Sequence, residues 1–150
     1  MEHIPRRRFL SVLAGTACTL LAGREARAAD PFAPLVAKLT GGAPARAGRV
    51  KLEMPRLADN GHSVPLKIVV ASPMTAADHV RTITLLSGRN PRPLMATFHL
   101  GPRAGRPEVA TRVRLNGTQQ VLAVAQLSDG SWWSGSAEVE VTESACLDAG

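Results

Sequence analysis

A change in hydrophobic period near residue 50 is the feature that most constrains this chain. From there to residue 141, short runs rich in Val, Leu, Ile and Thr alternate apolar and polar positions, which is typical of half-buried strands. The runs are VKLEM, SVPLKIVVAS, VRTITLLS, LMATFHL, EVATRVRL, QQVLAVAQLS and SWWSGSAEVEV. Turn residues separate them: Asp59-Asn60-Gly61, Asn90-Pro91, Gly101-Pro102, Asn116-Gly117 and Asp129-Gly130. We therefore predict an all-β fold, an immunoglobulin-like antiparallel β-sandwich over residues 49–141.

Residues 29–48 have a different pattern, that of a short amphipathic helix followed by a connector rich in Pro, Gly and Ala. The segment DPFAPLVAKLTGG places apolar residues at helical spacing, with Asp30 in a capping position and Gly41 as a stop. Such a helix needs a surface to cover its apolar stripe. We interpret Phe32 and Leu35 as candidate contacts with a partner protein.

Residues 1–28 read as a secretory signal peptide. Three arginines precede an apolar stretch that is too short to span a membrane, and Ala26-Arg27-Ala28 forms a cleavage site. The sequence RRRFL fits the twin-arginine form, with an ordinary secretory signal as the alternative. Both interpretations place the mature chain in the periplasm and predict no membrane span.

Removal of residues 1–28 changes the charge balance, because it takes away five arginines and two glutamates. The formal net charge falls from +6 to +3, and 122 residues remain, enough for one domain. A modestly basic exported domain fits anionic small molecules or acidic protein surfaces better than nucleic acid. We expect no nucleic-acid partner.

The C-terminal segment TESACLDAG, residues 142–150, carries the remaining cysteine, Cys146, on what we predict to be a flexible arm. Cys18 lies in the signal peptide, so Cys146 has no intramolecular partner in the mature chain. A thiol of ordinary pKa is only about 3% thiolate at pH 7, and the neighbouring Glu143 and Asp148 lower that fraction further. The arm extends roughly 17 Å from Val141 to the sulfur. The pattern favours a thiol that partner enzymes act on over a catalytic nucleophile, with an unimportant tail cysteine as the alternative.

No other motif carries obvious chemistry. Three histidines in the domain are scattered without ligand spacing, and we predict no metal site and no cofactor. Arg112 and Arg114 alternate with apolar residues, which places two cations on the outward face of one strand.

The adjacent Trp132 and Trp133 must point to opposite faces of their strand. Trp133 continues in steps of two to Ala137, Val139 and Val141, which predicts that it faces the core. Trp132 continues through Ser and Glu, which predicts an exposed indole and a candidate partner anchor. The alternative is a bulge at Gly135 that shifts the register and hides Trp132.

Taken together, several blocks resemble the SoxY family of sulfur-carrier subunits from the bacterial thiosulfate-oxidising Sox system. They are PRLADNGHSVPLKIVV, SPMTAADHVRTITLLSGRNPRPLMATFHL, EVATRVRL, QQVLAVAQLSDGSWW and the cysteine-bearing tail. The resemblance implies an immunoglobulin-like domain that forms a heterodimer with a SoxZ-like subunit. It also implies that Cys146 holds an inorganic sulfur substrate covalently while separate cytochrome, hydrolase and dehydrogenase components process it. On this interpretation the chain is a carrier and not itself an enzyme.

The tail departs from the family pattern, Gly-Gly-Cys-Gly-Gly. Here Ser144-Ala145 and Leu147-Asp148 flank the cysteine, which adds bulk and a negative charge to the arm. Two alternatives therefore stay open: a divergent thiol carrier and a non-covalent interaction module, each serving another periplasmic oxidation system.

Overall fold

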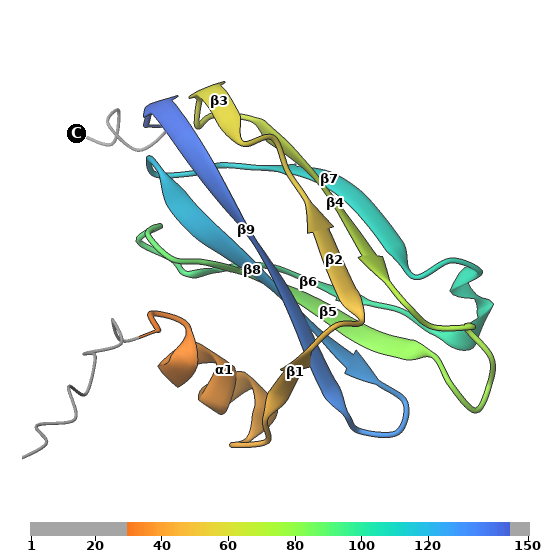
Figure 1. Ribbon diagram of the computed structural model, residues 1–150. Coiled ribbons are helices and arrows are strands. Elements are labelled where there is room, and N and C mark those ends of the chain that lie inside the picture. Colours follow the sequence, from red (N-terminus) through yellow and green to blue (C-terminus); the bar gives the residue numbers. More distant parts are fainter. Residues whose placement is uncertain (1–29, 145–150) are drawn as a thin grey trace, which may run out of the picture.

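The computed structural model describes residues 30–144 of the chain. Two β-sheets pack face to face, and one short helix lies on the outer face of the larger sheet (Figure 1). The predicted signal peptide and Cys146 lie outside the described residues. Within the described part, no helix has the length and apolar character needed to cross a membrane.

The helix and strands follow the chain in a simple order. They are α1 (Ala33–Thr40), β1 (Ala45–Ala47), β2 (Val50–Glu53), β3 (Leu57–Asn60), β4 (Val64–Val70), β5 (Val80–Ser87), β6 (Leu94–His99), the 3-10 turn η1 (Pro102–Ala104), β7 (Glu108–Val113), β8 (Gln119–Leu127) and β9 (Trp132–Glu143). The seven predicted strand runs correspond in order to the strands β2 and β4 to β9, and β9 extends two residues beyond its predicted run. The β-sandwich is confirmed.

The larger sheet has the order β1-β9-β8-β5-β6, with β3 also paired to β9, and the smaller sheet has the order β2-β4-β7. Most pairs are antiparallel, but β1 and β3 both run parallel to β9. The segment between β4 and β5 crosses from the smaller sheet to the larger one, as expected for a loop at the edge of the sandwich.

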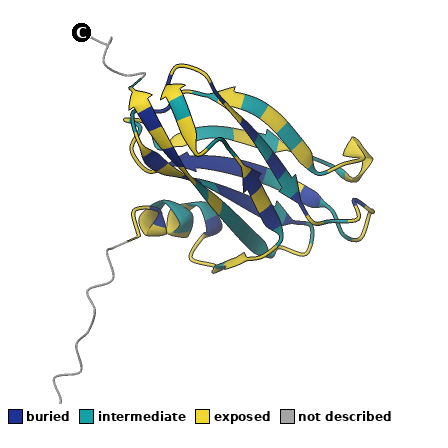
Figure 2. Ribbon diagram, turned by 45° about the horizontal axis from the view of Figure 1, so that its top comes forward, coloured by how far each residue is buried: buried dark blue, intermediate teal, exposed yellow. Residues whose placement is uncertain are grey.

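The main core lies between the two sheets. Strand β4 alternates buried and less buried residues along its whole length, and its buried side chains include Val64 and Ile68, both 0% exposed. Strand β5 is buried on both faces over Ile83–Ser87 because the larger sheet also has a covered outer surface. Figure 2 shows this concentration of buried residues in the central strands.

Helix α1 covers part of that outer surface. The helix begins after Phe32, which is its N-cap residue, and not after Asp30 as predicted. The Asp30 carboxylate instead accepts a hydrogen bond from the backbone N–H of Phe32 at 2.9 Å and so stabilises the turn that precedes the helix. Gly41 ends the helix in the left-handed conformation, with φ of 66°, and its N–H bonds to the carbonyl of Ala37. A second apolar cluster joins the helix to the sheet through Phe32, Leu86 and Val124.

Strands β1 and β3 were not predicted from the sequence. Asp59 and Asn60 belong to β3, where we expected a turn. Their strand geometry comes from parallel pairing with β9, in which Ala58 lies opposite Val141 and Asn60 opposite Glu143. This pairing is set by tertiary structure, because LADN itself has little strand character.

Candidate functional site at the end of the last strand

The described chain ends immediately after β9, two residues before Cys146. The position of this end is fixed by backbone contacts with β3 and the turn that follows it. The carbonyl of Glu143 accepts a hydrogen bond from the Gly61 N–H at 2.7 Å, and the Thr142 hydroxyl donates to the Asp59 carbonyl. The Ser144 hydroxyl also bonds to the side-chain oxygen of Asn116. The point at which the predicted C-terminal arm begins, here called the arm exit, is therefore anchored to two neighbouring loops.

A second anchor is Thr118, which lies in the loop between β7 and β8. Its hydroxyl accepts a hydrogen bond from the Val141 N–H at 2.9 Å and lies 3.4 Å from the Val141 carbonyl. Together with Ser144, this contact ties the final residues of β9 to the loop between β7 and β8.

A network of buried polar side chains joins the loop between β7 and β8 to the loop between β5 and β6. Ser87 and Gln119 are 1% and 6% exposed, and the Ser87 hydroxyl donates to the Gln119 side-chain oxygen. The Gln119 amide donates to the Asn90 side-chain oxygen at 3.1 Å, and the same oxygen accepts from the Asn116 N–H at 2.9 Å. Satisfied buried networks of this kind fix loop positions. The loop between β5 and β6 and the loop between β7 and β8 are thus held together beside the arm exit (Figure 1).

Cations are concentrated at this end of the sandwich. Arg89 and Arg92 are exposed on the loop between β5 and β6, and Arg114 is exposed after β7, close enough for its carbonyl to accept a bond from the Asn90 side chain at 2.8 Å. Arg112 is also exposed, and its guanidinium donates to the Ser63 carbonyl at 3.3 Å. Sequence reasoning found Arg112 and Arg114 but did not connect them to the arm, and it missed Arg89.

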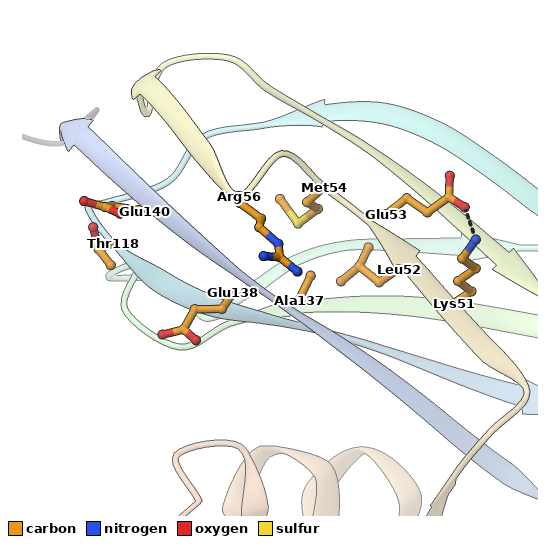
Figure 3. A pocket seen from close by; sticks show the side chains of 9 residues that line it. All are labelled: Lys51, Leu52, Glu53, Met54, Arg56, Thr118, Ala137, Glu138 and Glu140. Atoms are coloured by element: carbon orange, nitrogen blue, oxygen red, sulfur yellow. Dashed lines mark ion pairs between the residues drawn. The ribbon is translucent and has the colours of Figure 1, made fainter.

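A groove of about 920 Å³ runs between β2 and β9. Leu52, Met54 and Ala137 give it an apolar floor, whereas charged side chains line its rim: Lys51, Glu53, Arg56, Glu138 and Glu140 (Figure 3). Lys51 and Glu53 form an ion pair at 2.6 Å. Thr118 closes the end of the groove that lies toward the arm exit, so the groove and the exit are neighbours.

The altered pKa values of charged groups have structural causes. The Lys51 ammonium, which donates a hydrogen bond to Glu53, holds the pKa of that carboxyl below its usual value. Hydrogen bonds from Ser131 lower the pKa of Asp129. Among residues 30–144, no three His, Cys, Asp or Glu side chains are grouped as a metal site would require.

The two tryptophans lie on opposite faces of β9, as predicted. Trp133 packs against the main core and lies under the Arg49 guanidinium, 5.1 Å from ring centroid to cation. Trp132 packs against the outer cluster beneath α1 and is half-buried, so the prediction of an exposed indole is wrong. The pairing of β8 with β9 continues without a shift past Gly135, so Trp132 is covered by the helix and not hidden by a bulge.

Phe32 also requires a correction as a partner contact. Its side chain is 2% exposed within this chain, because the helix stripe lies on the protein's own sheet. Leu35 is half-buried against the same cluster. An amphipathic pattern shows that a helix face is covered but does not identify what covers it. The interface roles of Leu35 and Trp132 stay predictions.

The comparison with protein families decides the affiliation of the chain. The family described as sulfur oxidation protein SoxY matches residues 36–146, which is most of the chain. The chain belongs to the SoxY family. The matched range contains every strand of the sandwich and continues through the arm exit to Cys146.

Solved structures agree with this affiliation. The sulfur carrier protein SoxY from Chlorobium limicola f thiosulfatophilum is 27% identical, with a TM-score of 0.61 over 73% of this chain and 94% of that one. Superoxide reductases share the fold alone. The neelaredoxin from Ignicoccus hospitalis is 20% identical, with a TM-score of 0.56 over 63% of this SoxY-family chain and 80% of its own. No curated protein sequence matches.

Proposed function

We propose that this protein is a periplasmic sulfur carrier, which binds a sulfur substrate covalently through Cys146 and presents it to the enzymes of thiosulfate oxidation. In this proposal a SoxZ-like subunit forms a heterodimer with the sandwich. Residues 1–28 direct export by the twin-arginine route, and residues 142–150 act as the arm.

One observation supports the proposal above the others: the SoxY family match extends to residue 146 and so includes the cysteine. That cysteine follows a strand end that several hydrogen bonds anchor to a rigid sandwich. A fixed exit followed by a short segment suits a carrier, because the length of the segment limits how far the thiol can lie from the domain that binds the partners.

The chemistry requires partner enzymes. Joining the Cys146 sulfur to the outer sulfur of thiosulfate forms an S–S bond, releases the thiol proton and removes two electrons. The electrons must pass to an acceptor, which in this proposal is the cytochrome component. Oxidation of the bound sulfur and hydrolytic release then fall to the dehydrogenase and hydrolase components, and the thiol is regenerated.

Replacement of Cys146 by serine tests this function. In a reconstituted system with the SoxZ-like subunit and the three enzyme components, Cys146→Ser should abolish thiosulfate turnover. Association with the subunit and the melting temperature should stay unchanged, because the residue lies beyond the last strand. Turnover by the serine variant at the wild-type rate would support a non-covalent interaction module instead.

A further inference from the structure

The guanidinium of Arg89 lies at the surface beside the exit of the C-terminal arm. One of its nitrogens donates to the Thr118 carbonyl at 3.3 Å. The same nitrogen is close to the Cα side of Gly117, where an added Cβ would lie 3.5 Å away. Gly117 adopts φ of 78°, so the turn presents only backbone to the arginine.

Arg89 is held in place by the buried network below it. Its backbone N–H is shared between the Gln119 side-chain oxygen at 3.1 Å and the Ser87 hydroxyl at 3.3 Å. Ser87 and Gln119 are two of the four buried polar residues of the described chain. Burying polar groups is favourable only when they are satisfied, and here the satisfied network determines the position of one loop. The backbone that carries Arg89 is therefore preorganised.

Among residues 30–144, no carboxylate forms an ion pair with Arg89. The ion pairs between described residues involve other cations, namely Arg49, Lys51 and Lys67. A guanidinium has five N–H donors, and only one contact to the Thr118 carbonyl is made here. The remaining donors are free to bind an anion, for which the planar guanidinium is well suited.

The position of Arg89 matches the reach of the arm. Gly117 follows Asn116, whose side chain bonds to Ser144, so the guanidinium lies within roughly 10–15 Å of the arm exit. Two residues, a cysteine side chain and a carried sulfur group span on the order of 10 Å. Arg92 and Arg114 add positive charge at the same end, whereas Asp59 and Glu143 are the nearby acids.

We propose that Arg89 is a positioning residue that binds the anionic sulfur group carried on Cys146. This rests on the proposed function and deepens it, because it assigns the negative end of the cargo to a named side chain. The charged residues close to Cys146 in the sequence are all acidic. The cation that offsets the negative charge of the cargo therefore comes from a loop more than fifty residues earlier in the chain.

The test compares two disulfide reagents on the chain from Ala29 to Gly150, in which Cys146 is the only thiol. Dithiobis(nitrobenzoate) carries two carboxylates, whereas dithiodipyridine is uncharged at neutral pH. In both reactions the Cys146 thiolate attacks a disulfide sulfur, a mixed disulfide forms and an aryl thiol leaves, which is followed by absorbance. The second-order rate constant for the anionic reagent is divided by that for the neutral reagent. This ratio measures how strongly the protein attracts the anionic reagent, because a change in the pKa of the Cys146 thiol affects both rate constants.

At low ionic strength, Arg89→Gln should lower the anionic-to-neutral ratio by about two- to fivefold, and Arg89→Lys should retain most of the wild-type ratio. Arg103→Gln is the matched control, since it removes one exposed positive charge from η1, at the opposite end of the sandwich (Figure 1). The control should leave the ratio unchanged. Thermal unfolding of each variant verifies that the fold is intact.

An equal ratio in wild type and Arg89→Gln, or an equal decrease in Arg103→Gln, would overturn the assignment of Arg89. Neither reagent depends on sulfur metabolism, so these rates are separate from the carrier function. A decrease confined to Arg89→Gln supports the assignment even if the protein carries no sulfur in cells. If the protein has carrier activity but Arg89→Gln leaves the ratio unchanged, the proposed function is retained and Arg89 has no role in it.

Discussion

Gly135 of β9 lies directly against Val50 of β2, so close that a Cβ at position 135 would be 2.2 Å from the Val50 carbonyl oxygen. The contact joins the two sheets of the sandwich at the point where β2 crosses β9. It gives the glycine a packing role, in place of the bulge that its position in a strand suggested.

Gly135→Ala should therefore destabilise the domain by about 1–3 kcal/mol, because backbone must move to admit the methyl group. Denaturant unfolding measures the change. Gly101→Ala is the control, since Gly101 has extended geometry and nothing within 4 Å of an added Cβ. A loss of stability no larger at Gly135 than at Gly101 would show that the two sheets are less closely packed here than the structure indicates.

Phe32→Ala should also lower the free energy of unfolding, by about 3–5 kcal/mol, because it removes the side chain that attaches α1 to the sheet. Trp132→Ala should destabilise by less, since its ring is only half-buried in the same cluster. Ala37→Ser, at an exposed position of the helix, is a suitable control. If Phe32→Ala unfolds at the wild-type denaturant concentration, the helix does not depend on this contact.

The fold could be predicted from the sequence where its signals are local. Alternation of apolar residues identified β2 and β4 to β9, and Gly41 correctly marked the end of α1. Strands β1 and β3 were missed because pairing with β9, and not their own residues, makes them strands. The burial of Phe32 within its own chain was missed, because the apolar stripe of a helix does not identify the surface that covers it.

The candidate site likewise has one part that could be predicted from the sequence and one part that could not. Cys146 could be selected from the sequence alone, because it is the only cysteine that follows the predicted signal peptide. The loop contacts around the exit could not, since Asn90 meets Asn116 and Arg89 meets Thr118 only through the register of β5 with β8. Spacing in the sequence contains no information on such pairings.

Asp129 should titrate below the usual range for an aspartate, because the Ser131 hydroxyl and N–H both bond to its carboxylate, at 2.6 and 2.8 Å. A lowered folded-state pKa stabilises the protein above the unfolded pKa, and this contribution is lost as the pH falls through the folded pKa. We expect Ser131→Ala to raise the pKa of Asp129, measured by NMR titration of its side chain. A pKa that does not move would mean that the Ser131 hydroxyl is not the cause.

The flanks of Cys146 should affect how readily Sox enzymes accept this carrier. Changing Leu147 and Asp148 to glycine removes bulk and a negative charge beside an anionic cargo, so the turnover rate with enzymes of a typical Sox system should increase. Ala149→Gly is the control for an added glycine alone. Slower turnover by the double variant would indicate that this tail is matched to different enzymes, as in a divergent carrier.

Intact mass spectrometry of the protein isolated from cells grown on thiosulfate tests the covalent loading of Cys146 most directly. We expect an added mass that maps to Cys146, disappears on treatment with a thiol reductant and is absent from Cys146→Ser. Only unmodified chains in thiosulfate-grown cells, or the same adduct on Cys146→Ser, would contradict it.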